Sequence, residues 1–341
     1  MLLEIAVAIV VCLVGFVYAS IKPPPPKICG SPGGPPVTSP RIRLKDGRHV
    51  AYLLRGVPLE KAKHKVVVCH GYRDVKDMVF IYSQELLEEL ETCFVIYDRP
   101  GYGESDPSQK RGPKSEAEDI EELADHLQLG SRFHIMGISM GVYVVWGCLM
   151  YIPHRLLGAS FVGSFHNYYW SGFPPELVNK CFKKQSLQSQ WIGKIAYYAP
   201  WLLYWFMTQN LFVGNFKTNE NDSPLTEEDI ELLKKVHMSS DIAPLLEKAS
   251  QQGIYYSFFQ DMLAAFGKWE NNHLDMKNPF PNQEGKVHFW QGSHDKITPA
   301  ELSRFTVEKL SWIKYHELPE KGHFIIHNPD LCERIIRESV S

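Results

Sequence analysis

Residues 132–146 read RFHIMGISMGVYVVW, and this stretch decides the fold. Its first five residues form an apolar-rich run typical of a strand, and the residues after Gly141 continue as an apolar helical pattern. Between them, Ser139 has Gly137 and Gly141 two positions away on either side. A serine held on a sharp strand-to-helix turn occupies strained backbone, and a Cβ at either flanking position would collide with the neighbouring strand or helix. The pattern predicts a nucleophile elbow that presents the Ser139 hydroxyl above a sheet.

Two further residues, each placed after a strand pattern, complete a nucleophilic arrangement. A serine hydroxyl needs a histidine to accept its proton, and a carboxylate holds that histidine in one tautomer. In chains with this elbow the acid precedes the histidine. Asp295 follows the strand pattern of residues 287–290, and His323 lies in a loop after the strand pattern of residues 313–318. We therefore expect Ser139 to be the nucleophile, Asp295 the orienting acid and His323 the general base.

Backbone N–H groups are expected to stabilise the oxyanion. Residues 65–69 read as a short buried strand, and His70 and Gly71 follow it directly. Gly71 lets the backbone approach a substrate carbonyl closely, so the N–H groups of Tyr72 and Met140 are the expected donors. An ordinary glycine turn after a strand is the alternative.

The sequence implies no metal and no cofactor. His327 lies four residues after His323, the spacing of a metal pair on a helix. No third ligand or glutamate motif accompanies the pair, and Pro329 interrupts any helix there. The seven cysteines show neither a metal pattern nor a paired spacing, so a disulfide framework is not expected.

Five motifs in this order resemble the α/β-hydrolase superfamily. They are the tripeptide HGY of residues 70–72, the loop DRPGYGES of residues 98–105, the elbow, residues 292–295 and the dipeptide Gly322-His323. Around the core, the chain looks most like the membrane-anchored α/β-hydrolases of plants. The resemblance covers residues 41–163 and 276–341, the predicted core, and implies a mostly parallel eight-stranded sheet flanked by helices.

Residues 164–275 interrupt the alternation of strands and helices. They carry helical patterns, such as those of residues 226–236 and 242–251, and are dense in Trp, Tyr and Phe. In the architecture that the resemblance implies, an insertion at this point lies over the active site. We call residues 164–275 the cap and expect this helical segment to determine substrate choice.

The first 21 residues are expected to anchor the chain in a membrane as a transmembrane helix. Residues 5–21 carry no charge and are rich in Val, Ile, Leu and Ala, a length at the short end of the range that spans a bilayer. A cleaved signal peptide is the alternative, but Glu4 and the absence of Lys and Arg before the run argue against cleavage. Residues 22–40, rich in Pro and Gly, predict a stiff spacer between anchor and enzyme.

Charges around the apolar run predict the location of the enzyme. Four basic residues follow the run, at Lys22, Lys27, Arg41 and Arg43, and none precedes it. The positive-inside rule then places the catalytic domain on the cytosolic face of an endomembrane, such as that of the endoplasmic reticulum. A glycosylated sequon at residues 221–223 would place it on the other face, although Pro224 disfavours that use. Secretion after signal cleavage is the alternative.

Composition describes an ordinary globular chain of 341 residues, 44% of them hydrophobic and 22% charged. The net charge of −3 gives no reason to expect nucleic acid as a partner. The expected partners are a small-molecule ester or lipid substrate and, through the anchor, membrane lipid.

These features predict a membrane-anchored serine hydrolase that cleaves a carboxylic ester through an acyl-enzyme. An anchored enzyme with an apolar cap favours a lipophilic ester. An acyltransferase or an amidase would use the same residues with a different acceptor or substrate. A small-ligand sensor or scaffold that keeps the pocket with little turnover is the alternative from another class.

Overall fold

Eight strands form one sheet at the centre of the molecule. The computed structural model describes residues 2–78, 82–208, 225–239, 243–282 and 285–341. In spatial order the strands are β1 (Arg41–Arg43), β2 (His49–Gly56), β4 (Thr92–Tyr97), β3 (His64–Cys69), β5 (Phe133–Ile138), β6 (Leu156–Val162), β7 (Lys286–Gly292) and β8 (Lys314–Leu318). β2 pairs antiparallel with β1 and with β4, and the pairs from β4 to β8 are parallel. The predicted eight-stranded, mostly parallel sheet is confirmed.

The central strands are buried on both faces, and their side chains alternate between two cores. In β3, Val67 and Cys69 contribute to one core, whereas Val66 and Val68 contribute to the other. Successive side chains of a strand point to opposite faces, so a strand covered on both sides needs apolar residues at every position. This requirement explains why the run of residues 65–69 has no polar alternation.

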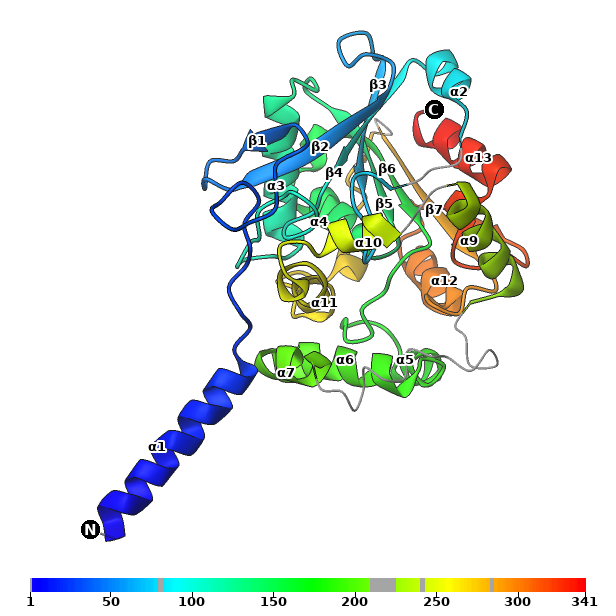
Figure 1. Cartoon of the computed structure of the whole chain (residues 1–341). Coiled ribbons are helices and arrows are strands. Elements are labelled where there is room, and N and C mark those ends of the chain that lie inside the picture. Colours follow the sequence, from blue (N-terminus) through cyan, green and yellow to red (C-terminus); the bar gives the residue numbers. More distant parts are fainter. Residues whose placement is uncertain (1, 79–81, 209–224, 240–242, 283–284) are drawn as a thin grey trace.

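Helices cover the two faces of the sheet. α3 (Pro113–His126), α4 (Val142–Tyr151) and α12 (Ala300–Lys309) contribute side chains to the core on one face. α2 (Gln84–Glu89) and α13 (Pro329–Ser339) pack into the core on the other face (Figure 1). Because the strands from β4 to β8 run parallel, their carboxyl ends lie at one edge of the sheet, where ligands of open α/β sheets bind.

α3 begins earlier than the sequence predicts. The pair Ser115 and Glu118 has the spacing of a capping box, which predicts a start at residue 116. The helix instead begins at Pro113, and its N-cap Gly112 makes no side-chain capping bond. The Ser115 hydroxyl donates to carbonyls of the preceding loop. The capping-box prediction is wrong because proline, with a fixed φ and no N–H, suits the first helical position and starts the helix by itself.

The chain between β6 and β7 is helical. The α-helices in its described residues are α5 (Pro175–Lys183), α6 (Leu187–Tyr198), α7 (Leu203–Thr208), α9 (Glu227–Ser239), α10 (Ala243–Ala249) and α11 (Gln260–Phe266). Figure 1 shows α5, α6 and α7 in a row apart from the sheet, with α10 and α11 between that row and the sheet. α9 and α10 correspond to the helices predicted at 226–236 and 242–251. The division into a core of residues 41–163 and 276–341 and a cap of residues 164–275 stays a prediction.

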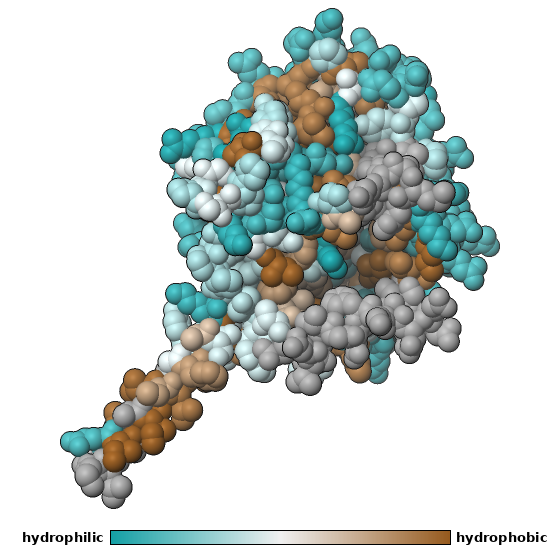
Figure 2. Space-filling model, in the orientation of Figure 1, coloured by the Kyte–Doolittle hydropathy of each residue, from teal (hydrophilic) through white to brown (hydrophobic). Residues whose placement is uncertain are grey.

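The N-terminal helix α1 (Leu2–Ile21) projects from the body and exposes apolar side chains (Figures 1 and 2). Among the residues that the structure describes, no helix combines the length and the apolar character needed to cross a membrane. Within α1, the side chains of residues 2, 3, 6, 8 and 14 lie outside the described part, and Glu4 adds a charge to the first turn. The transmembrane anchor predicted for residues 1–21, and the membrane location derived from it, are therefore not supported. The sequon at residues 221–223 lies outside the described residues.

Residues 22–40, for which the sequence predicts a stiff spacer, make hydrogen bonds to the body of the molecule. The N–H of Cys29 donates to Oε1 of Gln252 at 3.1 Å, and Cys29 is buried. Thr38 and Ser39 each donate a backbone N–H and a hydroxyl to the carboxylate of Glu104, over distances of 2.6 to 3.0 Å. A Pro-rich composition predicts an extended backbone, but the polar groups of its other residues remain available to bind a neighbouring surface.

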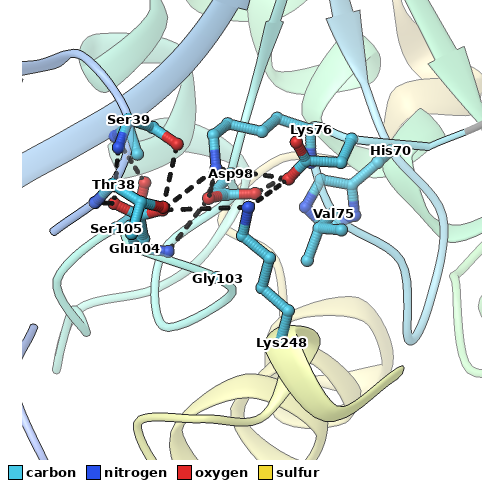
Figure 3. A network of polar contacts seen from close by, with 12 residues as sticks. Thr38, Ser39, His70, Val75, Lys76, Asp98, Gly103, Glu104, Ser105 and Lys248 are labelled. Carbon is cyan, nitrogen blue, oxygen red and sulfur yellow. Dashed lines mark hydrogen bonds and ion pairs between the residues drawn. The ribbon is translucent and has the colours of Figure 1, made fainter. Parts of the chain in front are cut away.

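Glu104 joins this segment to two other parts of the chain (Figure 3). Lys76, which is 1% exposed, lies 3.0 Å from Asp98 and 3.8 Å from Glu104. Lys248 of α10 also lies 3.8 Å from Glu104. Burial by itself would raise the pKa of Glu104, but the hydrogen bonds from residues 38–39 and the charge of Lys76 bring that pKa down to about 2. The ionised carboxylate thus ties residues 38–39, the loop after β3 and a cap helix together.

Candidate active site

Ser139 lies at the end of β5 in left-handed backbone. Its φ of 50° is uncommon for a residue with a side chain. A Cβ on Gly137 would lie 2.9 Å from the carbonyl oxygen of Gly141, and a Cβ on Gly141 would lie 2.3 Å from the carbonyl oxygen of Cys69. Close packing of β5, β3 and the following turn therefore requires glycine at both positions. The turn has the strained strand-to-helix geometry that its sequence predicts.

Hydrogen bonds link Ser139 to His323 and His323 to Asp295. Oγ of Ser139 lies 2.9 Å from Nε2 of His323, and Nδ1 of His323 lies 2.7 Å from Oδ2 of Asp295. His323 is 8% exposed and Asp295 is 6% exposed, whereas Ser139 is half-buried. The three residues follow β5, β7 and β8, at the carboxyl edge of the sheet. The structure thus brings together the three side chains that the sequence singles out.

Four groups besides His323 hold the carboxylate of Asp295. Oδ1 accepts the N–H groups of Ile297 and Thr298 at 2.9 and 2.8 Å. Oδ2 accepts the Thr298 hydroxyl at 2.7 Å and the Gln291 amide at 2.9 Å. Burial by itself would raise the pKa of Asp295, but the charge and hydrogen bond of His323 and the two hydrogen bonds from Thr298 lower it below its ordinary value. The carboxylate is therefore ionised and held in one orientation toward the histidine.

A second carboxylate, that of Asp229 in α9, supports the histidine loop. Its Oδ1 accepts the N–H of Phe324 at 2.9 Å, and Asp229 is 1% exposed. A Cβ on Gly322 would lie 2.1 Å from this carboxylate, so only glycine allows the approach. Burial by itself would lower the pKa of His323, but the charge and hydrogen bond of Asp295, and less strongly the charge of Asp229, raise it above its ordinary value.

The substitution Asp229→Asn is expected to lower the pKa of His323. The asparagine carbonyl can still accept the N–H of Phe324, but it lacks the negative charge that favours the imidazolium. An NMR titration of the His323 ring measures this pKa directly. Glu228→Gln is the matched control, because Glu228 lies on the same helix and pairs with Lys321 at 2.6 Å. An unchanged His323 pKa in the Asp229 variant, or an equal fall in both variants, would contradict this electrostatic assignment.

The backbone of Gly71 lies against the serine. A Cβ on Gly71 would be 3.4 Å from Cβ of Ser139. The next residue, Tyr72, packs its ring on Phe258 of the cap, with ring centroids 5.5 Å apart. Residues 71 and 72 therefore pass beside the serine, which is where an oxyanion donor is needed. The N–H groups of Tyr72 and Met140 stay the predicted donors.

Sequence reasoning missed several residues around this arrangement. They are Gln291, Thr298 and Asp229, which hold Asp295 and the histidine loop, and the buried pair of Arg99 and Asp261. Gln291 and Thr298 lie four residues before and three residues after the acid, so both carried a local signal. Arg99 lies in the loop motif of residues 98–105, but its partner Asp261 is 162 residues away, and Asp229 is 95 residues from Phe324. A single sequence contains no spacing from which such distant pairs could be detected.

One histidine pair outside this site resembles a metal site by composition but not by geometry. Among the described residues, ligand atoms of His288, His316 and Glu338 lie within 4.8 Å of one another. Nδ1 of His288 lies 3.0 Å from Nε2 of His316, while the ring centroids are 5.2 Å apart and the planes differ by 9°. The rings thus lie end to end with the two nitrogens facing each other, as in an N–H···N hydrogen bond. A metal would need both lone pairs to converge on a third point.

Two hollows of about 410 and 370 Å³ lie near the start of α3. Both are lined by Gly112, Pro113, Lys268 and Trp269, and neither is lined by a residue of the Ser139, His323 and Asp295 set. We therefore assign neither hollow to chemistry at Ser139.

A family model with the description alpha/beta hydrolase fold matches residues 65–330. The chain belongs to the alpha/beta hydrolase family. The match spans the loop after β3, the elbow, the cap and the histidine loop of this alpha/beta hydrolase. The comparisons do not show the resemblance to plant membrane-anchored members. No curated protein sequence matches the chain.

Solved structures share the fold of this alpha/beta hydrolase at low sequence identity. A carboxylesterase of the thaumarchaeon Nitrososphaera gargenis is 14% identical with a TM-score of 0.58, and the match covers 88% of this chain and 97% of that one. The esterase EaEST of Exiguobacterium antarcticum is 19% identical with a TM-score of 0.57, covering 89% and 100% of the two chains. A thermophilic esterase of Thermogutta terrifontis is 18% identical with a TM-score of 0.53, covering 88% and 97%. At these identities the likeness describes the fold.

Proposed function

We propose that this alpha/beta hydrolase is a serine hydrolase that cleaves a carboxylic ester. The observation that carries the proposal is the continuous chain of hydrogen bonds from Ser139 Oγ through His323 to the ionised carboxylate of Asp295. A buried carboxylate on Nδ1 keeps the proton there and leaves Nε2 free to accept the serine proton. The fold is shared with several esterases, which agrees with the proposal.

The reaction follows from this arrangement in two halves. His323 takes the proton of Ser139 as Oγ attacks the ester carbonyl, and the N–H groups of Tyr72 and Met140 stabilise the oxyanion. His323 then returns the proton to the leaving alcohol, which gives an acyl-enzyme. A water molecule then gives a proton to His323 and attacks the acyl carbon, and His323 returns that proton to Oγ of Ser139 as the acid is released. Asp295 stabilises the imidazolium in both halves without taking its proton.

The surroundings of the serine favour an ester with an apolar acyl group. Tyr72 and Phe258 pack together beside Gly71, with ring centroids 5.5 Å apart. Phe324 follows the histidine directly, with its ring centroid 5.3 Å from that of His323. Apolar groups of this kind gain free energy by covering acyl chains rather than charged or sugar-like substrates. A lipophilic ester is therefore the proposed substrate class.

Two alternative functions would use the same residues. An acyltransferase would pass the acyl group to an alcohol or amine in place of water. A ligand sensor would keep the pocket but turn over slowly, since the family fold alone does not establish fast catalysis. The intact set of nucleophile, base and acid favours turnover, because binding alone does not need a histidine placed on a serine hydroxyl.

Covalent labelling with a fluorophosphonate tests the proposal. We expect the purified wild-type chain to be labelled at neutral pH and mass spectrometry to locate the label on Ser139, because only an activated serine attacks this phosphorus centre readily. A series of p-nitrophenyl esters of increasing acyl length then tests the substrate class. A folded chain that is not labelled and cleaves no ester would overturn the hydrolase assignment in favour of a sensor. Rapid cleavage of acetate with no cleavage of longer esters would overturn the lipophilic assignment alone.

A further inference from the structure

A buried arginine connects the cap to the loop beside the nucleophile. Arg99, in the loop after β4, and Asp261, in α11, are both fully buried. Nη1 and Nη2 of Arg99 donate to the two carboxylate oxygens of Asp261 at 2.5 and 2.7 Å. Nη2 also donates to the carbonyl oxygen of Gly71 at 3.0 Å. The guanidinium therefore spans from a cap helix to the backbone next to Ser139.

His70 provides a second donor to the same carbonyl. The backbone N–H of Arg99 donates to Nε2 of His70 at 3.1 Å, so Nε2 carries no proton. The proton of the neutral ring is then on Nδ1, which donates to the carbonyl oxygen of Gly71 at 2.8 Å. Two donors, one of them charged, thus bind this carbonyl oxygen.

Holding the Gly71 carbonyl also sets the direction of the Tyr72 N–H. The carbonyl of one residue and the N–H of the next belong to one planar peptide unit, and in a trans peptide they point in opposite directions. No cis peptide bond occurs in the described chain. The two donors to Gly71 therefore fix the plane of the Tyr72 N–H, and by drawing electron density toward the oxygen they make that N–H a stronger donor.

The charged residues around Arg99 fix the orientation of its guanidinium and add little to the stability of the fold. Asp261 also accepts from Arg111 Nη2 at 2.8 Å and from the Tyr102 hydroxyl at 2.7 Å. Arg111 in turn pairs with Glu116 at 2.8 Å, so two cations face two carboxylates, all buried. Ions moved out of water lose about as much solvation energy as they regain by pairing, and apolar residues would often stabilise the fold equally well. A fixed orientation is what the ions supply and apolar residues would not.

Asp261, the partner of Arg99, lies in α11 of the cap, whereas the peptide that Arg99 orients, between Gly71 and Tyr72, follows β3. Asp261 follows a helical turn of the cap (Tyr255–Phe259) that packs tightly on the loop after β4, where a Cβ on Gly101 would lie 2.0 Å from the carbonyl oxygen of Tyr256. Arg111 also donates to the carbonyl oxygen of Ser257 at 3.1 Å. The carboxylate is therefore in place only when this part of the cap is docked on the core.

We propose that Arg99 and Asp261 are positioning residues for the oxyanion donor at Tyr72, through the Gly71 carbonyl, and that docking of α11 completes the oxyanion hole. The inference rests on the proposed hydrolase function, in which the Tyr72 N–H binds the oxyanion. Neither side chain touches substrate. Their effect on the reaction passes through one peptide plane.

The variant Arg99→Lys tests this role. Lysine keeps the buried charge but cannot bind both oxygens of Asp261 and the Gly71 carbonyl with one planar fork. We expect kcat for p-nitrophenyl butyrate to fall by roughly ten- to a hundredfold, with KM little changed, because an oxyanion contact is made in the transition state. The affinity for butylboronic acid, which forms a tetrahedral adduct on the serine, should fall by the same factor as kcat. A merely structural role would not link these two quantities.

Arg48→Lys is the matched control. Arg48, directly before β2, makes a two-pronged pair with Asp119 of α3 at 2.6 and 2.9 Å. Replacing the planar guanidinium of Arg48 with an ammonium should lower thermal stability but leave kcat and boronate affinity unchanged. Asp261→Asn provides a second variant if Arg99→Lys does not fold, since asparagine keeps the shape of the carboxylate but holds the guanidinium less firmly.

The outcomes separate this inference from the function on which it rests. A wild-type chain with no labelling and no turnover removes the hydrolase assignment and the positioning role together. An active wild type whose Arg99→Lys and Asp261→Asn variants keep their kcat and boronate affinity overturns the positioning role alone. Loss of kcat without loss of boronate affinity, or a change confined to KM, also overturns it, because neither result is that of a weakened oxyanion hole.

Discussion

Replacing Ser139 with alanine is expected to abolish fluorophosphonate labelling and to lower kcat for ester cleavage by about 10⁶-fold. The hydroxyl supplies the nucleophile, and within the described part of the chain Nε2 of His323 has no other hydrogen-bond partner. A small residual rate would come from the oxyanion donors acting on bound ester, with water as the nucleophile. The fold should persist, because alanine at φ of 50° is strained no more than serine.

Ser164→Ala is the control for this change. Ser164 is fully buried after β6, and its hydroxyl has no hydrogen-bond partner within the described chain. The same substitution there should leave labelling and kcat unchanged. Thermal unfolding of both variants separates loss of chemistry from loss of structure. Labelling that persists in the Ser139 variant would place the reactive serine elsewhere and remove the assignment of the elbow.

The elbow shows why the centre of this fold was predictable from sequence. Gly137 and Gly141 are required by backbone that approaches within 2.3 to 2.9 Å of where a Cβ would lie, so the sequence records the packing directly. β3, beside the elbow, is buried on both faces and carries the uninterrupted apolar run of residues 66–69. Asp295 and His323 could be located because each follows a strand pattern, at residues 287–290 and 313–318, at the edge where active sites of these sheets form.

What the sequence did not reveal depends on contacts between distant residues. Asp229 lies 95 positions before Phe324, whose N–H it binds, and Asp261 lies 162 positions after Arg99. Each residue taken alone has the sequence signature of a solvated acid on a helix. Burial by the rest of the molecule changes an ordinary acid into a group that must be paired, and a single sequence contains no measure of that burial.

Residues 22–40 illustrate a different limit of prediction from sequence composition. Composition predicts that residues 22–40 extend, but it does not predict what lies beside an extended chain. The four hydrogen bonds from Thr38 and Ser39 depend on Glu104, which is itself oriented by Lys76 and Lys248. A Pro-rich segment therefore reads as a spacer in sequence, although a buried carboxylate on the core holds its end in place.

Asp295→Asn is expected to lower kcat by about 10⁴-fold while leaving the fold largely intact. The cause lies in the five donors around this carboxylate. Oδ1 faces two backbone N–H groups that cannot turn away, those of Ile297 and Thr298, so the asparagine oxygen must take that place. The amide NH₂ then occupies the position of Oδ2 and points at Nδ1 of His323. That nitrogen must become an acceptor, and the ring proton moves to Nε2, where it blocks acceptance of the Ser139 proton.

Thr298→Val separates this tautomer effect from a general loosening of the acid. Valine removes the 2.7 Å hydroxyl contact to Oδ2 but leaves the charge and the His323 contact in place. We expect its kcat to fall far less than that of the asparagine variant. Nitrogen NMR of the His323 ring reports the tautomer: the wild type should carry its proton on Nδ1 and Asp295→Asn on Nε2. An asparagine variant that keeps the Nδ1 proton and the wild-type rate would show that Asp295 is not the orienting acid.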